Sequence, residues 1–226
     1  MEKKLEIKLN ENRDISWDIV KAVCIILMVF AHTRIPRVAL SFIFMFHMGV
    51  FYFVAGYFLK TGASTKQTVR FFVKKKLVAL YKPYVIFGLL MVLLNPLMYK
   101  YHWEASAYSL QDIAKYSIKT ILFAGPLGYG VALWFLKSLF FSLGILLIIL
   151  QLVKSEKERA LLVMLLYSIG WTLARYKIDV PWSLSRDITV VILCYLGYIG
   201  RRLPPPYINS WNHQETRRLF RVASYV

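Results

Sequence analysis

The stretch WDIVKAVCIILMVFAHT, residues 17–33, is long and apolar, yet it carries Lys21 and His32, which lie eleven positions apart. An apolar run of this length predicts a helix that crosses a membrane. An ionisable side chain near the centre of such a helix costs roughly 2.5–3.5 kcal/mol to insert, so it usually faces the protein interior and serves a site. Eleven residues make about three helical turns, which puts both side chains on one stripe about 16 Å apart. We therefore expect Lys21 and His32 to line one passage from opposite ends.

The composition of the whole chain favours a membrane protein. Of its 226 residues, 58% are hydrophobic and 16% are aromatic, and the mean hydropathy is +0.51, which exceeds the usual share for a soluble domain. The predicted fold is all-α: a polytopic transmembrane helical bundle at residues 16–203, with a cytoplasmic segment at 1–15 and a polar cytoplasmic tail at 204–226. About six spanning helices are expected, at residues 16–33, 38–59, 77–99, 131–153, 159–175 and 186–203.

Positive charge sets the expected topology. The chain has 29 Lys and Arg against 12 Asp and Glu, and a cytoplasmic N-terminus places 18 of these cations in inner segments and 8 in outer ones. This bias predicts that both termini face the cytoplasm of a multi-pass inner-membrane protein. The net charge of +17 is then explained by topology and by attraction to the lipid bilayer, and no nucleic-acid partner is expected.

The predicted connections differ in character. The inner connection at residues 60–76 is basic, and the longer outer connection at 100–130 contains an amphipathic stretch that begins near Asp112. We expect that stretch to form a short surface helix or to close over a site. Cys24 and Cys194 fall within predicted spans, where packing is their simplest role, and no metal-ligand spacing is present.

Lys21, His32 and His47 are the first candidates for chemistry. Asp18 and Lys21 lie at i, i+3 and can neutralise each other, and His47 follows His32 by fifteen residues, within the second predicted span. Two imidazoles in one cavity would suit proton transfer near neutral pH. The residues alone leave plainer roles open: Lys21 can extend to the interface beside Asp18, His32 can cap a helix end, and His47 can simply pack.

Four blocks of sequence occur in an order that resembles the membrane acyltransferase 3 family. The first is Lys21, ten residues and then His32, which is similar to the basic-x10-His signature that opens the family. The others are FHMGVFYFVAGYF at 46–58, KKKLVALYKPY at 74–84 and LWFLKSLF at 133–140. Within the family, the chain is most similar to the fucose 4-O-acetylase-like group of O-acetyltransferases.

The resemblance implies an enzyme that moves an acyl group, usually acetyl from acetyl-CoA, to a hydroxyl of a cell-envelope sugar, polysaccharide or lipid-linked sugar. It implies catalytic roles for Lys21 and His32, and His47 is expected to assist. We expect Lys21 to attract the phosphates of the entering acyl-CoA, with Lys74, Lys75 and Lys76 as a second contact. In the simpler alternative, these three lysines serve only to keep the segment on the cytoplasmic side of the membrane.

Family members have more spans than the six predicted here, so the resemblance implies a domain that is shortened at its C-terminal end.

Two other functions stay open. The first alternative is a nonenzymatic transport or flipping protein, in which Lys21 and His32 line a path for substrate or protons. The second is an inactive truncated fragment.

Overall fold

The computed structural model describes residues 15–33, 35–61, 64–124, 133–178 and 180–202. The predicted segments 1–15 and 204–226 lie almost entirely outside these residues. Within the described ranges all regular secondary structure is helical, so the predicted all-α class is confirmed. The elements are α1 (Ile15–Ala31), α2 (Arg37–Tyr57), α3 (Thr65–Lys76), η1 (Leu77–Tyr81), α4 (Lys82–Lys100), α5 (Leu110–Ile121), α6 (Leu133–Leu152), α7 (Glu156–Arg175), η3 (Pro181–Ser183), α8 (Leu184–Thr189) and α9 (Val191–Gly200).

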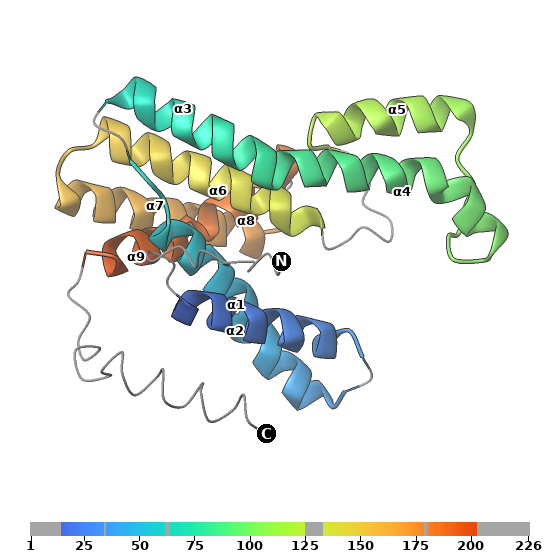
Figure 1. The fold of residues 1–226 in the computed structure, drawn as a ribbon, viewed down its shortest axis with the longest axis horizontal. Coiled ribbons are helices and arrows are strands. Elements are labelled where there is room, and N and C mark those ends of the chain that lie inside the picture. Colours follow the sequence, from blue (N-terminus) through green and yellow to red (C-terminus); the bar gives the residue numbers. More distant parts are fainter. Residues whose placement is uncertain (1–14, 34, 62–63, 125–132, 179, 203–226) are drawn as a thin grey trace, which may run out of the picture.

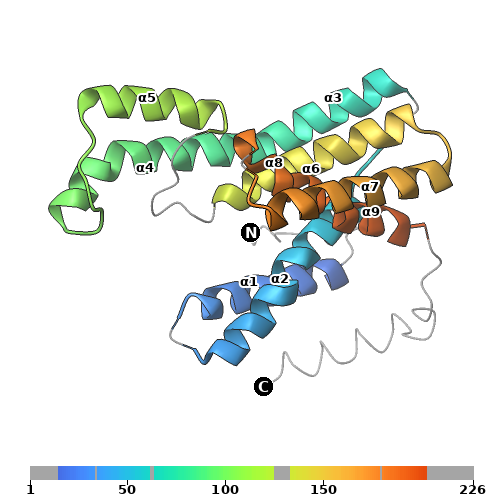
Figure 2. The same cartoon turned by 180° about the vertical axis from the view of Figure 1, so that it is seen from behind.

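The helices form a bundle from which two pairs extend. Figure 1 shows α3, α6, α7, α8 and α9 packed together, with α1 and α2 below them and the α4–α5 pair reaching away to one side. The opposite view in Figure 2 shows the same arrangement. The core lies around α6, and its most deeply buried hydrophobic members are Tyr52, Leu143, Leu146, Val163, Val191 and Cys194.

Among the residues that the structure describes, three helical stretches are long and apolar enough to cross a membrane. They are α2, the continuous helix Thr65–Lys100 and α6; a fourth is counted if the bent pair Pro181–Thr189 and Val191–Gly200 is one span. The predicted count of six is thus not confirmed. The 17 residues of α1 reach only about 26 Å, which is short of a hydrocarbon core of about 30 Å. Helix α7 begins with Glu156, Lys157, Glu158 and Arg159, so its apolar part is shorter than the helix itself.

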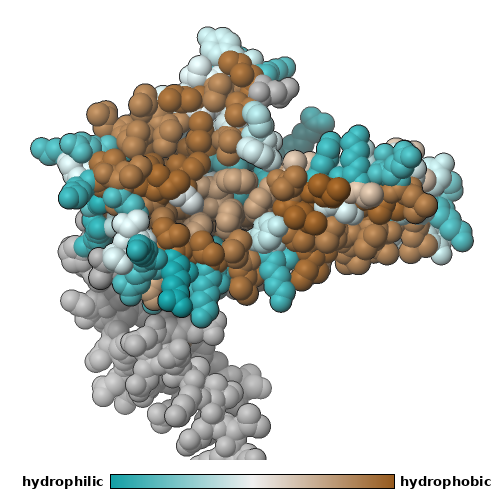
Figure 3. Space-filling model, turned by 90° about the horizontal axis from the view of Figure 1, so that it is seen from above, coloured by the Kyte–Doolittle hydropathy of each residue, from teal (hydrophilic) through white to brown (hydrophobic). Residues whose placement is uncertain are grey.

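The molecular surface agrees with a membrane location. Seen from above in Figure 3, hydrophobic residues cover a broad area over the bundle and the α4–α5 pair, and hydrophilic residues gather along its borders. Large exposed apolar side chains include Phe30, Phe42, Phe87, Leu93 and Leu165. A surface of this extent is unfavourable in water and favourable against lipid.

The predicted basic connection at 60–76 is largely helical and continues into α4. Ser64 caps α3 by accepting a hydrogen bond from the backbone N–H of Gln67 at 3.2 Å. Pro83 lacks an N–H and its ring would collide with the carbonyl of Ala79 in a regular helix, and the wider π-helical turn η1 ends just before it. The chain passes this proline without a break, and the continuous helix of 36 residues is about 54 Å long.

The amphipathic stretch in the predicted outer connection does form a helix, α5. The Ser109 hydroxyl accepts a hydrogen bond from the Asp112 N–H at 3.1 Å, and the Asp112 carboxylate accepts one from the Ser109 N–H at 3.1 Å. The Ser109 hydroxyl also donates to the Asp112 carboxylate at 2.7 Å, and this bond, together with the one from the Ser109 N–H, holds the pKa of Asp112 below its ordinary value. Helix α5 packs along α4, where a Cβ added to Gly88 would lie 2.6 Å from the Thr120 methyl group.

Helices α2 and α9 cross with their backbones in direct contact. A Cβ added to Gly56 would lie 1.9 Å from the carbonyl oxygen of Cys194, and one added to Gly197 would lie 1.9 Å from the carbonyl oxygen of Phe53. Small residues permit this approach, as they do at many helix crossings in membranes. The crossing joins the second helix of the chain to the last described one.

Candidate functional site

Lys21 lies on α1, where it is half-buried and paired. Its Nζ is 2.6 Å from a carboxylate oxygen of Asp18, one turn earlier, and 5.9 Å from the centroid of the Phe58 ring on the segment after α2. The predicted i, i+3 pair is therefore present. The contact with Phe58 places the ammonium beside the end of α2.

His32 follows the last residue of α1 and is exposed. Its Nδ1 lies 2.7 Å from the carbonyl oxygen of Met28. A carbonyl oxygen can only accept, so Nδ1 carries the hydrogen that makes this bond, and in the neutral ring Nε2 keeps its lone pair. The imidazole is thus held in the tautomer in which Nε2 is the basic atom.

His47 lies on α2, is fully buried and adopts the same arrangement. Its Nδ1 lies 2.7 Å from the carbonyl oxygen of Ile43, and its Nε2 has no hydrogen-bond partner. The Phe44 ring lies near both histidines, with its centroid 6.4 Å from that of His32 and 5.3 Å from that of His47. The structure thus brings both imidazoles to one phenylalanine.

The three consecutive lysines of α3 do not share one environment. Lys74 and Lys75 are exposed near the end of the helix, whereas Lys76 is half-buried and close to Cys194 of α9. Only Lys74 and Lys75 are freely available to a ligand in solution.

A buried polar cluster that the sequence analysis did not single out lies where α2, α6 and α8 meet. We call Tyr52, Lys137, Ser138, Arg186 and Asp187 the Asp187 cluster. The Tyr52 hydroxyl donates to the Ser138 hydroxyl at 2.8 Å, and the Lys137 ammonium donates to the carbonyl of Trp182 at 2.5 Å. Tyr52, Ser138 and Asp187 are at most 2% exposed, and Lys137 is 8% exposed.

The charged members of the Asp187 cluster lie close together. The charges of Lys137 and Arg186 act on the Asp187 carboxylate, and the Ser138 hydroxyl is nearby, yet neither carboxylate oxygen has a hydrogen bond of standard geometry. One feature of the sequence could have identified Lys137 as a candidate site residue: it interrupts an apolar span, as Lys21 does. Its partners are 45 residues or more away along the chain, so the pairing could not be read from spacing.

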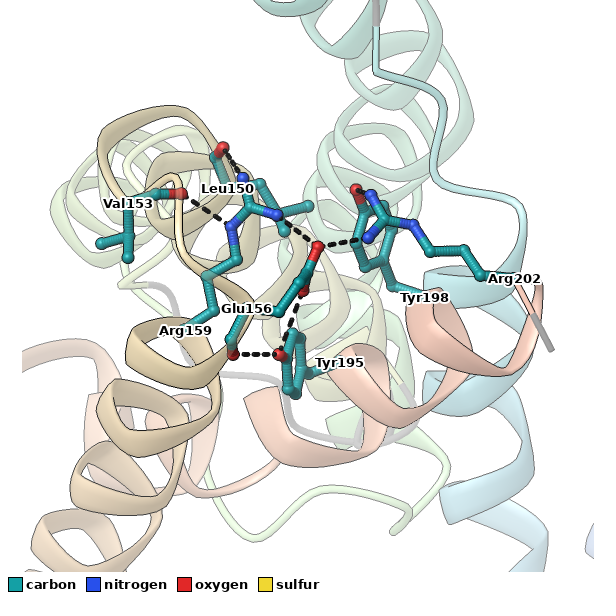
Figure 4. A network of polar contacts seen from close by, with 7 residues as sticks. All are labelled: Leu150, Val153, Glu156, Arg159, Tyr195, Tyr198 and Arg202. Atoms are coloured by element: carbon teal, nitrogen blue, oxygen red, sulfur yellow. Dashed lines mark hydrogen bonds and ion pairs between the residues drawn. The ribbon is translucent and has the colours of Figure 1, made fainter.

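A second polar cluster joins the ends of α6, α7 and α9, as Figure 4 shows. Arg159 donates to the α6 carbonyl of Leu150 at 3.0 Å, to the carbonyl of Val153 at 2.7 Å and to the Glu156 carboxylate at 2.7 Å. Arg202 donates to the same Glu156 oxygen and to the Tyr198 hydroxyl. These contacts satisfy carbonyls that the end of α6 leaves free and tie three helices together.

Glu156 makes this cluster sensitive to acid. Burial disfavours its charged form, but the hydrogen bond from Arg202 and the charge of Arg159 outweigh burial and lower the pKa of Glu156 below its ordinary value of 4.5. A depressed carboxylate pKa contributes stability above the unfolded pKa that is lost as pH falls through the folded pKa. We expect the thermal stability of the parent chain in detergent to exceed that of Glu156→Gln at pH 6–7, above the ordinary carboxylate pKa of 4.5. The difference should shrink as the pH falls below 4.5 and through the folded pKa.

Glu158→Gln is the matched control for that measurement, because Glu158 is an exposed carboxylate in the same helical turn. Its stability relative to the parent should be nearly constant across the same pH range. A Glu156→Gln difference that persists unchanged at low pH would contradict the assigned role of the carboxylate.

Comparison with known families identifies the class of protein. The family model described as an acyltransferase domain, that of the acyltransferase 3 family, matches residues 14–225. The chain therefore belongs to the acyltransferase 3 family, and with its apolar spanning helices it is a membrane acyltransferase. No curated protein and no solved structure gives a significant match.

Proposed function

We propose that the chain is an O-acyltransferase of the cell (inner) membrane that moves an acetyl group from acetyl-CoA to a hydroxyl of an envelope sugar, polysaccharide or lipid-linked sugar. Membership of the acyltransferase 3 family supports the reaction class. The observation that carries the proposal is the tautomer of His32: its Nδ1–H is engaged by Met28, so Nε2 is free to accept a proton.

The proposed reaction needs one general base. Nε2 of His32 takes the proton of the acceptor hydroxyl while the oxygen attacks the thioester carbonyl of acetyl-CoA. The new C–O ester bond forms, the C–S bond breaks, and the leaving CoA thiolate takes up the proton from the imidazolium. His47, in the same tautomer and also near Phe44, supplies a second Nε2 that can assist.

Lys21 is the proposed contact for the phosphates of acetyl-CoA on the cytoplasmic side, with the lysines of α3 as a second contact. An ammonium is attracted to phosphate oxygens and forms charge-assisted hydrogen bonds with them. Asp18, at 2.6 Å, keeps the ammonium in place until the donor arrives. In this proposal the N-terminus faces the cytoplasm, as the distribution of Lys and Arg favours.

The proposal is tested by acetyl transfer in membranes. Membranes that contain the 226-residue chain are incubated with labelled acetyl-CoA and envelope glycan, and the label in the glycan is counted against membranes without the chain. Label above that background supports the proposal. Movement of glycan across the membrane without acetyl-CoA would favour the transport alternative, and neither activity would favour the inactive fragment.

A further inference from the structure

The Asp187 cluster lies at an interruption in a helical span. The last described span is broken between α8 and α9, and the short turn before α8 holds two non-glycine residues with left-handed backbone angles, Trp182 at φ 59° and Ser183 at φ 57°. Such backbone conformations are unfavourable and collect at functional sites. The Lys137 ammonium reaches across from α6 to the carbonyl of Trp182 at 2.5 Å, so a charged group holds the strained turn in place.

Hydrogen bonding within the cluster is uneven. The hydroxyl groups have hydrogen-bond partners: Tyr52 donates to Ser138, and Ser142 donates to the carbonyls of Ser138 at 2.7 Å and Asp187 at 2.9 Å. In contrast, both carboxylate oxygens of Asp187 and the Nε of Arg186 are buried without a hydrogen-bond partner. Buried charges in a purely structural network are normally hydrogen-bonded, so the Nε–H of Arg186 is a donor with capacity left for a ligand. The Asp187 oxygens can only accept, and the charges of Lys137 and Arg186 act on them.

The charge of the cluster selects the sign of that ligand. Lys137 and Arg186 are cations and Asp187 is the one acid among the residues named, so the cluster is positive even with Asp187 ionised. A cation would be repelled. The Arg186 guanidinium lies over the Trp134 ring at 4.1 Å from its centroid. A planar guanidinium beside an ammonium matches the oxygens of a phosphate.

Two tryptophans indicate the depth of the cluster in the bilayer. Trp134 stands at the beginning of α6 and Trp182, 48% exposed, stands before α8. Tryptophan is enriched at the level of the lipid headgroups, which is also where the phosphates of membrane lipids lie. Both residues adjoin the cations of the cluster, so a phosphate at headgroup depth would meet Arg186 and Lys137 directly.

We infer that the Asp187 cluster binds a phosphate ester that is presented from the bilayer, with Arg186 and Lys137 as the groups that contact its oxygens. Two lipids carry this chemistry: the isoprenoid carrier of a lipid-linked sugar and the headgroup of an ordinary phospholipid. The carrier assignment rests on the proposed function, since it would bring the acceptor to the enzyme; the phosphate site itself does not.

Binding is measured on the full chain in nanodiscs of zwitterionic lipid, without acetyl-CoA. Farnesyl phosphate is the probe, farnesol is its uncharged counterpart and phosphatidylglycerol is the headgroup competitor. We expect farnesyl phosphate to bind and farnesol to bind at least tenfold more weakly. Arg186→Gln and Lys137→Gln should each weaken binding of the phosphate by roughly tenfold to a hundredfold, the effect of losing one charge-assisted hydrogen bond.

The controls separate the site from general charge and from misfolding. Lys157→Gln removes an exposed cation at the beginning of α7, about 20 Å along the helix from Gly170, which abuts α8. It should leave the affinity within about twofold, because a distant exposed charge contributes little. Arg186→Lys retains the charge but not the planar guanidinium, so it should recover part of the affinity that Arg186→Gln loses. Partial recovery by lysine shows that the loss is not caused by a collapsed fold.

The outcomes are distinct. Equal affinity for farnesol and farnesyl phosphate, or equal losses in Arg186→Gln and Lys157→Gln, would overturn the site. Competition by phosphatidylglycerol as strong as by farnesyl phosphate would keep the phosphate site and overturn the carrier assignment. The binding measurement does not depend on acetyl-CoA. A chain that binds the phosphate here but transfers no label in the separate acetyl-transfer assay would contradict the proposed function and leave this inference intact.

Discussion

Replacement of His32 with alanine is expected to lower acetyl transfer to the glycan by roughly 10²- to 10⁴-fold, the usual contribution of a general base. The substitution removes the Nε2 lone pair that the hydrogen bond from Nδ1 to Met28 makes available. Binding of acetyl-CoA should change little, because His32 is assigned to the acceptor hydroxyl and not to the CoA phosphates. The measurement is the initial rate of label transfer from acetyl-CoA in membranes with equal amounts of each protein.

Two further variants serve as controls for the His32→Ala experiment. His32→Gln keeps an N–H donor but has no basic nitrogen, so its rate should be as low as that of alanine. His102→Asn changes an exposed histidine in the turn after α4 whose backbone φ of 59° asparagine tolerates, and its rate should stay within about twofold of the parent, the usual range for surface changes. A His32→Ala rate similar to that of His102→Asn would remove His32 from the mechanism.

Gly197→Ala is expected to destabilise the folded chain by about 3 kcal/mol or more, the upper range for overpacking in a close contact. Its new Cβ would lie 1.9 Å from the Phe53 carbonyl oxygen and 2.9 Å from the Tyr57 nitrogen. These are backbone atoms of α2, so no side-chain rotation can relieve the collision and the two helices must separate. Thermal unfolding in detergent micelles, followed by helical circular dichroism, measures the loss.

Gly49→Ala is the matched control, because it makes the same chemical change on α2, the other helix of the crossing pair. The nearest atom to its added Cβ is the Leu193 side chain at 3.7 Å, an ordinary contact. Since alanine favours a helix over glycine by up to about 1 kcal/mol, Gly49→Ala should leave stability unchanged or slightly raised. Equal midpoints for the two variants would show that the α2–α9 contact is looser than the structure indicates.

The sequence predicted the features that depend on local patterns. Continuous apolar runs predicted α2 at 38–59 and α6 at 131–153, close to Arg37–Tyr57 and Leu133–Leu152. The i, i+3 spacing predicted the Asp18–Lys21 pair. Helix length and ion pairs within one turn follow from nearest neighbours along the chain, so spacing alone is sufficient for them.

Features that depend on contacts between distant segments could not be predicted. The basic residues of α3 predicted an inner connection by their charge. The structure shows a helix there that lies alongside α6, where the rings of Phe72 and Phe140 pack with their centroids 5.6 Å apart. Lys137 and Asp187 stood in two different predicted segments. Their proximity depends on how α6 and α8 meet, which no periodicity in either segment encodes.

The close approach of Gly56 to the Cys194 backbone, and of Gly197 to the Phe53 backbone, also has a consequence for biosynthesis. The two glycines are 141 residues apart, and at synthesis rates of about 5–20 residues per second the ribosome needs roughly 7–28 s to make the chain between them. During that interval α2 is already in existence while its partner helix is not. The apolar groove around Gly56 must therefore be covered by lipid or by the insertion machinery until the last helix arrives, and α2 and α9 come together as a late step of assembly.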